Sequence, residues 1–390
     1  MKAFCILSTA SLTGGSSKSF VQYCLEINEK NGMELVVSVP CKGPAYDTLT
    51  ENNITTEIIP VRFNIYPKLS WRNFLIYPLI ILHNHIVNKR QEKLLLNCVK
   101  VHNPDIIYTN VGVINIGYNV AKKLHIPHIY HLREYQDLDF GMRIMPSRLS
   151  YIKCLQKSHN ICITKGIQKH FKLNDDNSVV IYNGIENLPK KKKDYIRGKY
   201  FLFVGRLSEA KGTHLVLKAF KSFCKRNDDY RLLLAGEPNT TEYKQKLVDF
   251  CKESNIESRV EFLGARNDID HLMQKCYAVI VASEFEAFGR VTPEAMYNEC
   301  LVLGRNTSGT KEQFDNGVEL TGKEIGIRFY DECDLTKKML YAINLSPIEY
   351  KQITERARYT VGKLYTTKGC ADAIYEYFNN VIEENGKDNA

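Results

Sequence analysis

Short apolar runs alternate with amphipathic stretches along most of the 390-residue chain. The runs are rich in Val, Ile, Leu and Phe, which is typical of parallel strands that are buried on both faces. In the first half, the runs that predict strands are 2–8, 34–39, 104–108, 127–130, 160–164 and 178–182. Between them, 20–27 and 114–124 repeat apolar residues at helical spacing. This alternation predicts an α/β fold with a mostly parallel sheet.

The second half repeats the alternation. Its predicted strands are 200–205, 231–236, 260–264, 278–282 and 300–304, and its predicted helices are 213–225, 242–254, 269–275, 335–344, 347–364 and 370–384. The small and polar residues of 306–312 predict a loop. A chain of this length exceeds what one hydrophobic core usually organises, so we expect two domains.

Leu188-Pro-Lys-Lys-Lys-Lys193 marks the expected boundary, because a proline followed by four like charges is solvated linker composition. We therefore divide the chain into a first domain at 1–188, a basic linker at 189–199 and a second domain at 200–366. A terminal helix with a polar tail occupies 367–390.

Composition narrows the setting. Of the residues, 44% are hydrophobic and 25% are charged, as in an ordinary globular protein. The twelve cysteines form no C-x-x-C pair, which indicates reduced thiols in a cytosol. The apolar run after Met1 is too short for a signal peptide, so a cytoplasmic location is expected.

Candidate chemistry lies where predicted strands end. Gly14-Gly15 follows the first strand and would let a phosphate approach the backbone, although a turn without a ligand is equally consistent. The dinucleotide fingerprint and the phosphate loop of nucleotide triphosphatases are both missing from this turn. His131 follows another strand, where it would meet a ligand hydroxyl or serve a structural role.

The second domain offers charges for a phosphorylated, polyhydroxylated ligand. Arg206 and Lys211 follow the strand 200–205 and would form an anion clamp. Glu286 and Glu294 flank the loop after 278–282, and Thr292-Pro293 predicts a capped helix start between them. The alternative is that Glu294 interacts with its own helix dipole and that Glu286 is a solvated loop charge.

Two further segments have competing interpretations. Asp137-Leu138-Asp139 is similar to an acidic triplet that holds a metal ion in another class of sugar-transferring enzymes, but such triplets are common in loops and we predict no metal site. Segment 62–102 carries seven Lys or Arg against one acid, among aromatic residues that include Trp71. It would lie on an anionic membrane surface or form a packed helix with a solvated cationic face.

Several segments together resemble the retaining "group 1" glycosyltransferases. They are Gly14-Gly15, Pro127-His-Ile-Tyr-His-Leu-Arg-Glu134, Ile181-Tyr-Asn-Gly-Ile185, Val204-Gly-Arg-Leu-Ser-Glu-Ala-Lys-Gly212 and Glu286-Ala-Phe-Gly-Arg-Val-Thr-Pro-Glu294. The resemblance covers the whole chain and is strongest in the second half. It implies the GT-B fold, in which two Rossmann-like domains face a cleft and the terminal helix crosses back to the first domain.

The resemblance also implies roles for individual residues. Arg206 and Lys211 would hold the diphosphate of a nucleotide-sugar, Glu286 would face the sugar, and Glu294 would bind the ribose. The other residues with an implied place at the donor are Gly14, Gly15, His131, Phe288 and Gly289. Glu299 and Ser308 stand where many relatives have glycine, which puts the identity of the donor in doubt.

The implied activity is retaining transfer of a hexosyl group from a nucleotide-sugar to a saccharide, carried on a lipid, in surface polysaccharide assembly. A sugar-nucleotide epimerase of the same fold and a non-catalytic sugar-binding protein are the alternatives. No metal or other cofactor and no nucleic-acid partner are expected. Segment 62–102 adds the hypothesis of peripheral attachment at the inner face of a membrane.

Overall fold

The computed structural model describes residues 1–388 apart from 31, 67–74, 141–142, 145–146 and 186–195. The chain divides into two compact units, of which the first is Met1–Gly184 with Thr367–Ala390 and the second is Ile185–Thr366. The division falls at Gly184, a few residues before the boundary expected at 188. Most of the expected linker 189–199 lies outside the described residues, which resume at 196.

The first unit is built on a seven-stranded parallel sheet in the order β3-β2-β1-β5-β6-β8-β9. The strands are β1 (Lys2–Ile6), β2 (Glu34–Val39), β3 (Thr55–Ile58), β5 (Ile106–Asn110), β6 (His128–Leu132), β8 (His159–Cys162) and β9 (Ser178–Val180). A separate antiparallel pair joins β4 (Ile65–Tyr66) and β7 (Arg143–Ile144). All residues of β5 and β6 are buried, including the polar Thr109, Asn110, His128 and His131.

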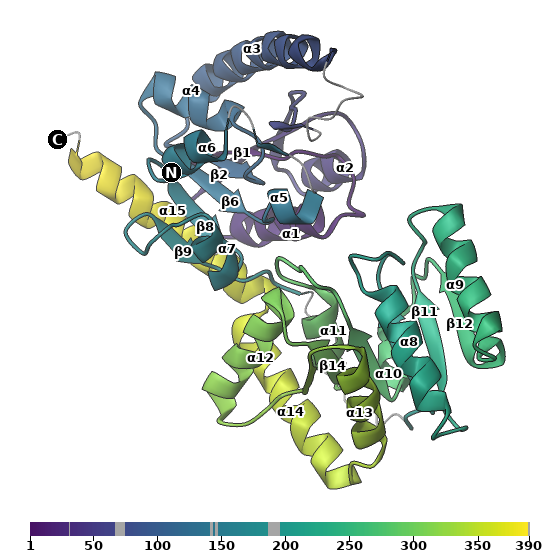
Figure 1. Ribbon diagram of the computed structural model, residues 1–390. Helices are drawn as coiled ribbons and strands as arrows, with labels where there is room; N and C mark the ends of the chain where they lie inside the picture. Colours follow the sequence, from purple (N-terminus) through teal and green to yellow (C-terminus); the bar gives the residue numbers. More distant parts are fainter. Residues whose placement is uncertain (31, 67–74, 141–142, 145–146, 186–195, 389–390) are drawn as a thin grey trace. The chain divides into compact units, whose positions relative to one another are not determined.

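Helices cover both faces of this sheet (Figure 1). They are α1 (Gly15–Asn28), α2 (Pro44–Glu51), α3 (Tyr77–His102), α4 (Ile116–Leu124), α5 (Asp137–Phe140), α6 (Arg148–Leu155), α7 (Lys165–His170) and α15 (Thr367–Asp388). On one face, apolar residues of α1, α2 and α15 form one core cluster with the strands. On the other face, α3 and α4 form a second cluster with the strands.

The last helix, α15, belongs to the first unit, which confirms the prediction that it crosses back (Figure 1). Its apolar face packs into the core of that unit beside α1, through Cys370, Ala371, Ile374, Phe378 and Val381. The ring of Phe378 lies 5.1 Å from that of Tyr108, measured between centroids. The two ends of the chain therefore share one core.

The second unit has a six-stranded parallel sheet in the order β12-β11-β10-β13-β14-β15. Its strands are β10 (Tyr200–Val204), β11 (Arg231–Ala235), β12 (Val260–Gly264), β13 (Ala278–Val281), β14 (Leu301–Arg305) and β15 (Ile327–Phe329). Its helices are α8 (Thr213–Cys224), α9 (Thr241–Glu253), the 3-10 helix η1 (Glu257–Arg259), α10 (Ile269–Lys275), α11 (Val291–Tyr297), α12 (Ser308–Thr321), α13 (Glu332–Ile343) and α14 (Pro347–Leu364). Both units have the expected mixed α/β architecture.

The hydrophobic pattern missed α12, and the prediction of a loop at 306–312 is wrong beyond Thr307. The helix includes Gly309, Asn316 and Gly317, which have low helix propensity. Its formation follows from tertiary packing, because Phe314 is fully buried. The elements α2, β3 and β15 were also missed, since they are short and their apolar periodicity is weak.

Helix α3 has two dissimilar halves. Near its C-terminus, Leu95 and Val99 are fully buried in the core. Near its N-terminus, the exposed apolar residues Leu79, Leu82 and Ile86 follow one another at helical spacing. None of the described helices is long and apolar enough to cross a bilayer. Trp71 lies outside the described residues.

We predict that Phe378→Ala lowers the midpoint of urea unfolding strongly, because removal of a buried phenylalanine side chain costs about 3–5 kcal/mol. Phe378 is 1% exposed. Glu376→Ala is the matched control, since Glu376 is an exposed residue of the same helix. Equal midpoints for the two variants would show that α15 does not complete the core of the first unit.

Candidate active site

The order of strands in the second sheet reverses at β10. The chain passes from β10 to β11 on one side, whereas the later strand β13 pairs with the other side of β10. At such a switch point the loops after the two central strands diverge and leave a crevice beyond their carboxyl ends. The loop after β10 contains Arg206 and Lys211, and the loop after β13 contains Glu286. The topology therefore brings the predicted cations and the predicted carboxylate to one edge.

The loop after β10 is anchored by its backbone. Leu207 is buried, and its N–H donates to the carbonyl oxygen of Glu237 at 2.8 Å. The loop ends at Gly212, which precedes the first turn of α8. Lys211 is half-buried, whereas Arg206 is exposed. In the part of the chain that the structure describes, Arg206 makes no ion pair, so its guanidinium is available to an anion.

Lys211 and Glu286 form an ion pair, with 2.5 Å between Nζ and Oε2. Both belong to the lining of a cavity of about 50 Å³ beyond β10 and β13, together with Gly205 and Gly289. Gly289 has a φ of +78°, and a Cβ there would lie 2.7 Å from Cγ of Glu286. Glycine is thus required for the loop to fold this closely around Glu286. An anionic ligand that bound Lys211 would compete with Glu286 for the ammonium group.

Glu294 lies in the first turn of α11 and accepts a hydrogen bond from Nε of Arg290 at 3.1 Å. Its side chain is 28% exposed. The predicted helix start is wrong, because α11 begins at Val291 and Thr292 is not its cap. Thr292 is fully buried, and its Oγ1 lies 3.4 Å from that of Thr310. The start of α11 is thus fixed by packing, and the carboxylate of Glu294 pairs with Arg290, four residues earlier.

Phe288 supports the loop from inside. Its side chain is 3% exposed and packs edge-on against Tyr365, with 5.5 Å between ring centroids. A donor contact from this residue would therefore come from its backbone.

Helix α12, which the hydrophobic pattern missed, holds the acidic loop in place, that is, residues 282–290 between β13 and α11. The N–H of Gly309 donates to the carbonyl oxygen of Glu286 at 2.9 Å, and Oγ of Ser308 donates to that of Glu284 at 3.2 Å. Farther along, Nε2 of the buried Gln313 donates to the carbonyl oxygen of Phe288 at 2.6 Å. These residues position the loop that carries Glu286, and of the three only Ser308 had stood out in the sequence, as a departure from the family pattern. The Thr307-Ser308 pair before Phe314 is the one helix-start signal that would have indicated them.

The remaining candidates belong to the first unit. Gly14 and Gly15 are exposed at the start of α1, as the turn after the first strand predicts. Gly14 has a φ of −82°, which any residue adopts, and an added Cβ would only touch Oγ of Ser17 at 3.5 Å. Nothing in the conformation of Gly14 therefore requires glycine.

His131 was expected just beyond a strand. It lies instead within β6, where it is 1% exposed. Its Nδ1 atom is hydrogen-bonded to the hydroxyl of Tyr108 and lies 3.4 Å from Nη2 of Arg133. Burial and the nearby Arg133 lower the pKa of His131 well below its usual value, so the ring is neutral. Its Nε2 atom is buried and has no hydrogen-bond partner within the described residues.

Arg133 organises a polar network at this end of the first sheet. It is 4% exposed, and Nη1 donates to Oδ1 of Asn183 at 2.6 Å, while Nε donates to Oδ1 of Asn110 at 2.5 Å. A buried guanidinium with several fixed partners holds β5, β6 and the Asn183 turn together. In the sequence, Arg133 stood out only as part of the segment Pro127-His-Ile-Tyr-His-Leu-Arg-Glu134.

Residues 184–360 match the sequence profile of the family described as glycosyl transferases group 1. The chain is 27% identical over 312 residues to an uncharacterised glycosyltransferase of Methanocaldococcus jannaschii, covering 76% of this chain and 84% of that protein. The second unit therefore carries the profile of the group 1 glycosyltransferases, the family that its motifs resemble. The crystal structure of Anabaena Alr3699/HepE in complex with UDP has a TM-score of 0.75 at 18% identity and covers 97% of this glycosyltransferase and 100% of that chain. This likeness confirms the predicted GT-B fold.

A third relative has a named substrate. The N-acetylgalactosamine-N,N'-diacetylbacillosaminyl-diphospho-undecaprenol 4-alpha-N-acetylgalactosaminyltransferase of Campylobacter jejuni is 31% identical over 151 residues, which is 37% of this glycosyltransferase and 40% of that enzyme. The similarity therefore extends over part of each protein.

The two departures from the family pattern have a common physical basis. Glu299 and Ser308 both have positive φ, at 54° and 47°, in the left-handed region that favours glycine. Glu299 lies past the C-terminal end of α11, where its carboxylate is 3.5 Å from Arg358. Ser308 is bound to the acidic loop, as described above. Of the two, Ser308 is the residue that adjoins the candidate site.

Asp137, the first residue of the acidic triplet at 137–139, lies beside two basic side chains. Oδ1 of Asp137 lies 2.8 Å from Nε2 of His170, and its Oδ2 lies 3.4 Å from Nε of Arg148. These contacts tie α5 to α6 and α7.

We predict that Gly309→Ala destabilises the glycosyltransferase, because the new Cβ would lie 2.5 Å from the carbonyl oxygen of Phe288 and would push α12 away from the acidic loop. Forced overpacking typically costs about 1–3 kcal/mol. Gly362→Ala is the control, since Gly362 is exposed in α14 and an added Cβ meets nothing within 4 Å. That variant should gain about 0.5–1 kcal/mol from helix propensity. Thermal unfolding of both variants tests the contact, and a neutral Gly309→Ala would contradict it.

Proposed function

We propose that this glycosyltransferase moves a hexosyl group from a nucleoside diphosphate sugar to a saccharide acceptor, with retention of the anomeric configuration. The observation that carries the proposal is the ion pair of Lys211 with Glu286 at the switch point of the second sheet, with the exposed Arg206 in the same loop as Lys211. Cations suit a diphosphate, and a carboxylate accepts hydrogen bonds from sugar hydroxyls. A nucleotide-sugar carries both a diphosphate and sugar hydroxyls.

Arg206 and Lys211 would stabilise the leaving group. Cleavage of the anomeric bond leaves negative charge on the diphosphate, and fixed cations lower the free energy of that transition state. Lys211 would exchange its contact with Glu286 for the phosphate, which frees the carboxylate to face the sugar. With two cations in this role, the proposed reaction uses no metal ion.

The acceptor hydroxyl would attack from the face that the diphosphate leaves, without a covalent intermediate. In the second unit, Glu294 would bind the ribose, while Phe288 and Gly289 would contribute backbone. In the first unit, the backbone of Gly14 and Gly15 would meet phosphate. His131 would lie near the sugar, and its buried Nε2, which has no partner among the described residues, would reach a sugar hydroxyl once the side chains that cover it move aside.

Relatives support the choice of donor and acceptor. The Anabaena protein was crystallised with UDP, which favours a uridine diphosphate sugar as donor. The Campylobacter enzyme is named for an acceptor carried on diphospho-undecaprenol, which favours a lipid-linked saccharide in surface polysaccharide assembly.

We predict that Lys211→Met and Glu294→Gln weaken UDP binding in calorimetry and reduce sugar transfer, since loss of a hydrogen bond to a charged group costs about 1.5–3 kcal/mol. Glu284→Gln is the control, because Glu284 is an exposed carboxylate of the loop that also carries Glu286. Unchanged affinity and turnover in both site variants would reject the assignment. Release of free nucleoside diphosphate only when an acceptor is present would distinguish transfer from epimerisation.

Helix α3 is the proposed membrane contact. Its exposed apolar stripe, which we define as Leu79, Leu82 and Ile86 with Leu75 in the turn just before the helix, continues along α3 into the exposed cations Lys89, Arg90 and Lys93. A helix with apolar residues and cations in this order suits the surface of an anionic bilayer. Each cation near such a surface contributes about 1 kcal/mol, so the attachment would be reversible.

We predict that the protein floats with vesicles of anionic lipid at low salt and dissociates at high salt, because salt screens the attraction. A double substitution, Leu79→Asp with Leu82→Asp, should abolish flotation. Leu149→Asp is the control, since Leu149 is 72% exposed on α6, outside the apolar stripe. Protein that stays in the soluble fraction at low salt, or that binds neutral vesicles equally well, would show that the stripe has another partner.

A further inference from the structure

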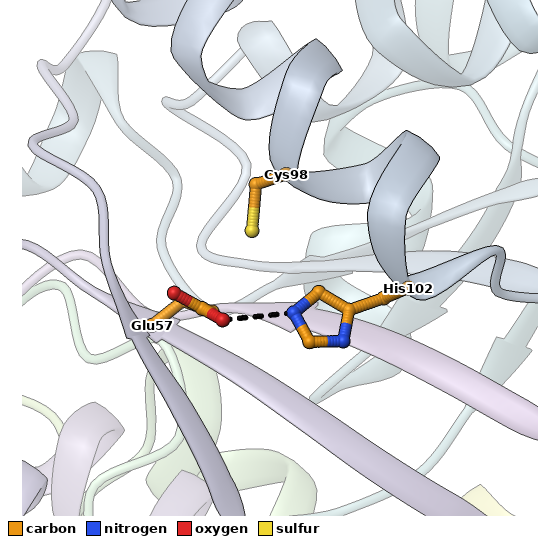
Figure 2. A group of neighbouring side chains, drawn as sticks. All are labelled: Glu57, Cys98 and His102. Atoms are coloured by element: carbon orange, nitrogen blue, oxygen red, sulfur yellow. Dashed lines mark hydrogen bonds and ion pairs between the residues drawn. The ribbon is translucent and has the colours of Figure 1, made fainter.

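Three metal-ligating side chains converge between β3 and α3. Glu57 comes from β3, whereas Cys98 and His102 lie one turn apart on α3. One ligand atom of each residue lies within 4.8 Å of the other two. Figure 2 shows the sulfur of Cys98 directed toward the pair formed by Glu57 and His102. Oε1 of Glu57 lies 2.8 Å from Nε2 of His102.

Well-ordered elements hold the three residues. Strand β3 forms one edge of the first sheet, with Glu57 in register with Ser38 of β2. The last turns of α3 are fixed above the same sheet by the fully buried Leu95 and Val99. The backbone positions of the three residues are therefore set by the core and not by a loop.

We propose that Glu57, Cys98 and His102 bind a zinc ion or a similar late divalent transition metal. Thiolate, imidazole and carboxylate are the three ligand types that zinc takes in proteins, at roughly 2.0–2.3 Å from the metal. Three protein ligands leave the fourth tetrahedral position to water. Magnesium and calcium select oxygen ligands, so the sulfur and nitrogen exclude them.

The ion pair alone does not account for the arrangement. It explains why Glu57 faces His102, but a neutral thiol gains little beside a carboxylate. Burial, with a smaller contribution from Glu57, raises the pKa of Cys98 to about 11, so at neutral pH the side chain is a thiol and not a nucleophile. A metal ion bound there would take the proton's place on sulfur. The His102 and Glu57 side chains are 17% and 40% exposed, which gives an ion access from solvent.

The metal would join the edge strand to the C-terminal end of α3. The opposite half of α3 carries the apolar stripe, so the ion would fix the base of the helix that presents this stripe. The three ligands are distinct from every residue assigned to sugar transfer, and the inference does not depend on the proposed function.

Cobalt binding to the full chain tests the proposal. The chain is stripped of metal with a chelator, reduced, and titrated with Co²⁺ without oxygen, because a cobalt–thiolate bond gives a charge-transfer absorption in the near ultraviolet. We expect one equivalent of Co²⁺ to produce this band and Zn²⁺ to displace it. Zn²⁺ should also raise the thermal unfolding midpoint.

Variants separate this site from the other cysteines. Cys98→Ser should lose the band, and Glu57→Gln and His102→Gln should weaken binding by roughly 10- to 100-fold, the loss typical of impaired metal sites. Cys41→Ser is the control, since Cys41 is an exposed cysteine of the same unit, and it should behave as the parent chain. Absence of the band in the parent chain, or its persistence in Cys98→Ser, would overturn the proposal and leave Glu57 and His102 as an ion pair.

Discussion

The parallel pairing of β10 with β13 is the constraint on which the candidate active site depends. These strands are far apart in the sequence, yet Phe201 pairs with Ala278 and Phe203 with Ile280. Their side chains belong to one core cluster, and a slip of one strand by one residue would move its members of that cluster to the opposite face of the sheet. The positions of Lys211 and Glu286 follow from this register. The candidate active site is thus positioned by apolar residues that themselves carry no reactive group.

Backbone hydrogen bonds then refine what the sheet begins. The loop with Glu286 has no regular structure of its own, and α12 supplies donors for its carbonyl groups through Gly309 and Gln313. Buried carbonyl groups without partners are costly, so this helix stabilises one conformation of the loop. Glu286 is thereby positioned by residues of a separate helix. The left-handed backbone of Ser308 belongs to the same support.

The sequence was sufficient for whatever depends on local pattern. Strand β2 was predicted at 34–39 and is found at Glu34–Val39, and the charges after β10 and β13 were identified because they follow apolar runs. It was not sufficient where tertiary packing decides. Helix α12 contains two glycines, and its formation follows from tertiary packing, in which Phe314 is fully buried. His131 was expected in a loop but lies in β6. The strand extends this far because it pairs with β5 and β8, and such pairs cannot be read from the local sequence. The reversal of strand order at β10 has no sequence signal at all.

The sharing of one core by both ends of the chain bears on how the protein is made. A ribosome releases residues 1–184 first, but the part of α1 that packs against α15 stays uncovered until α15 has been synthesised. The second unit, in contrast, is continuous at 185–366 and has all of its core residues before translation ends. The unit that begins the chain is therefore the last to be completed, and the nascent protein carries an open apolar surface for most of its synthesis. Chaperones would meet α1 in this interval, and a truncated chain would keep that surface open.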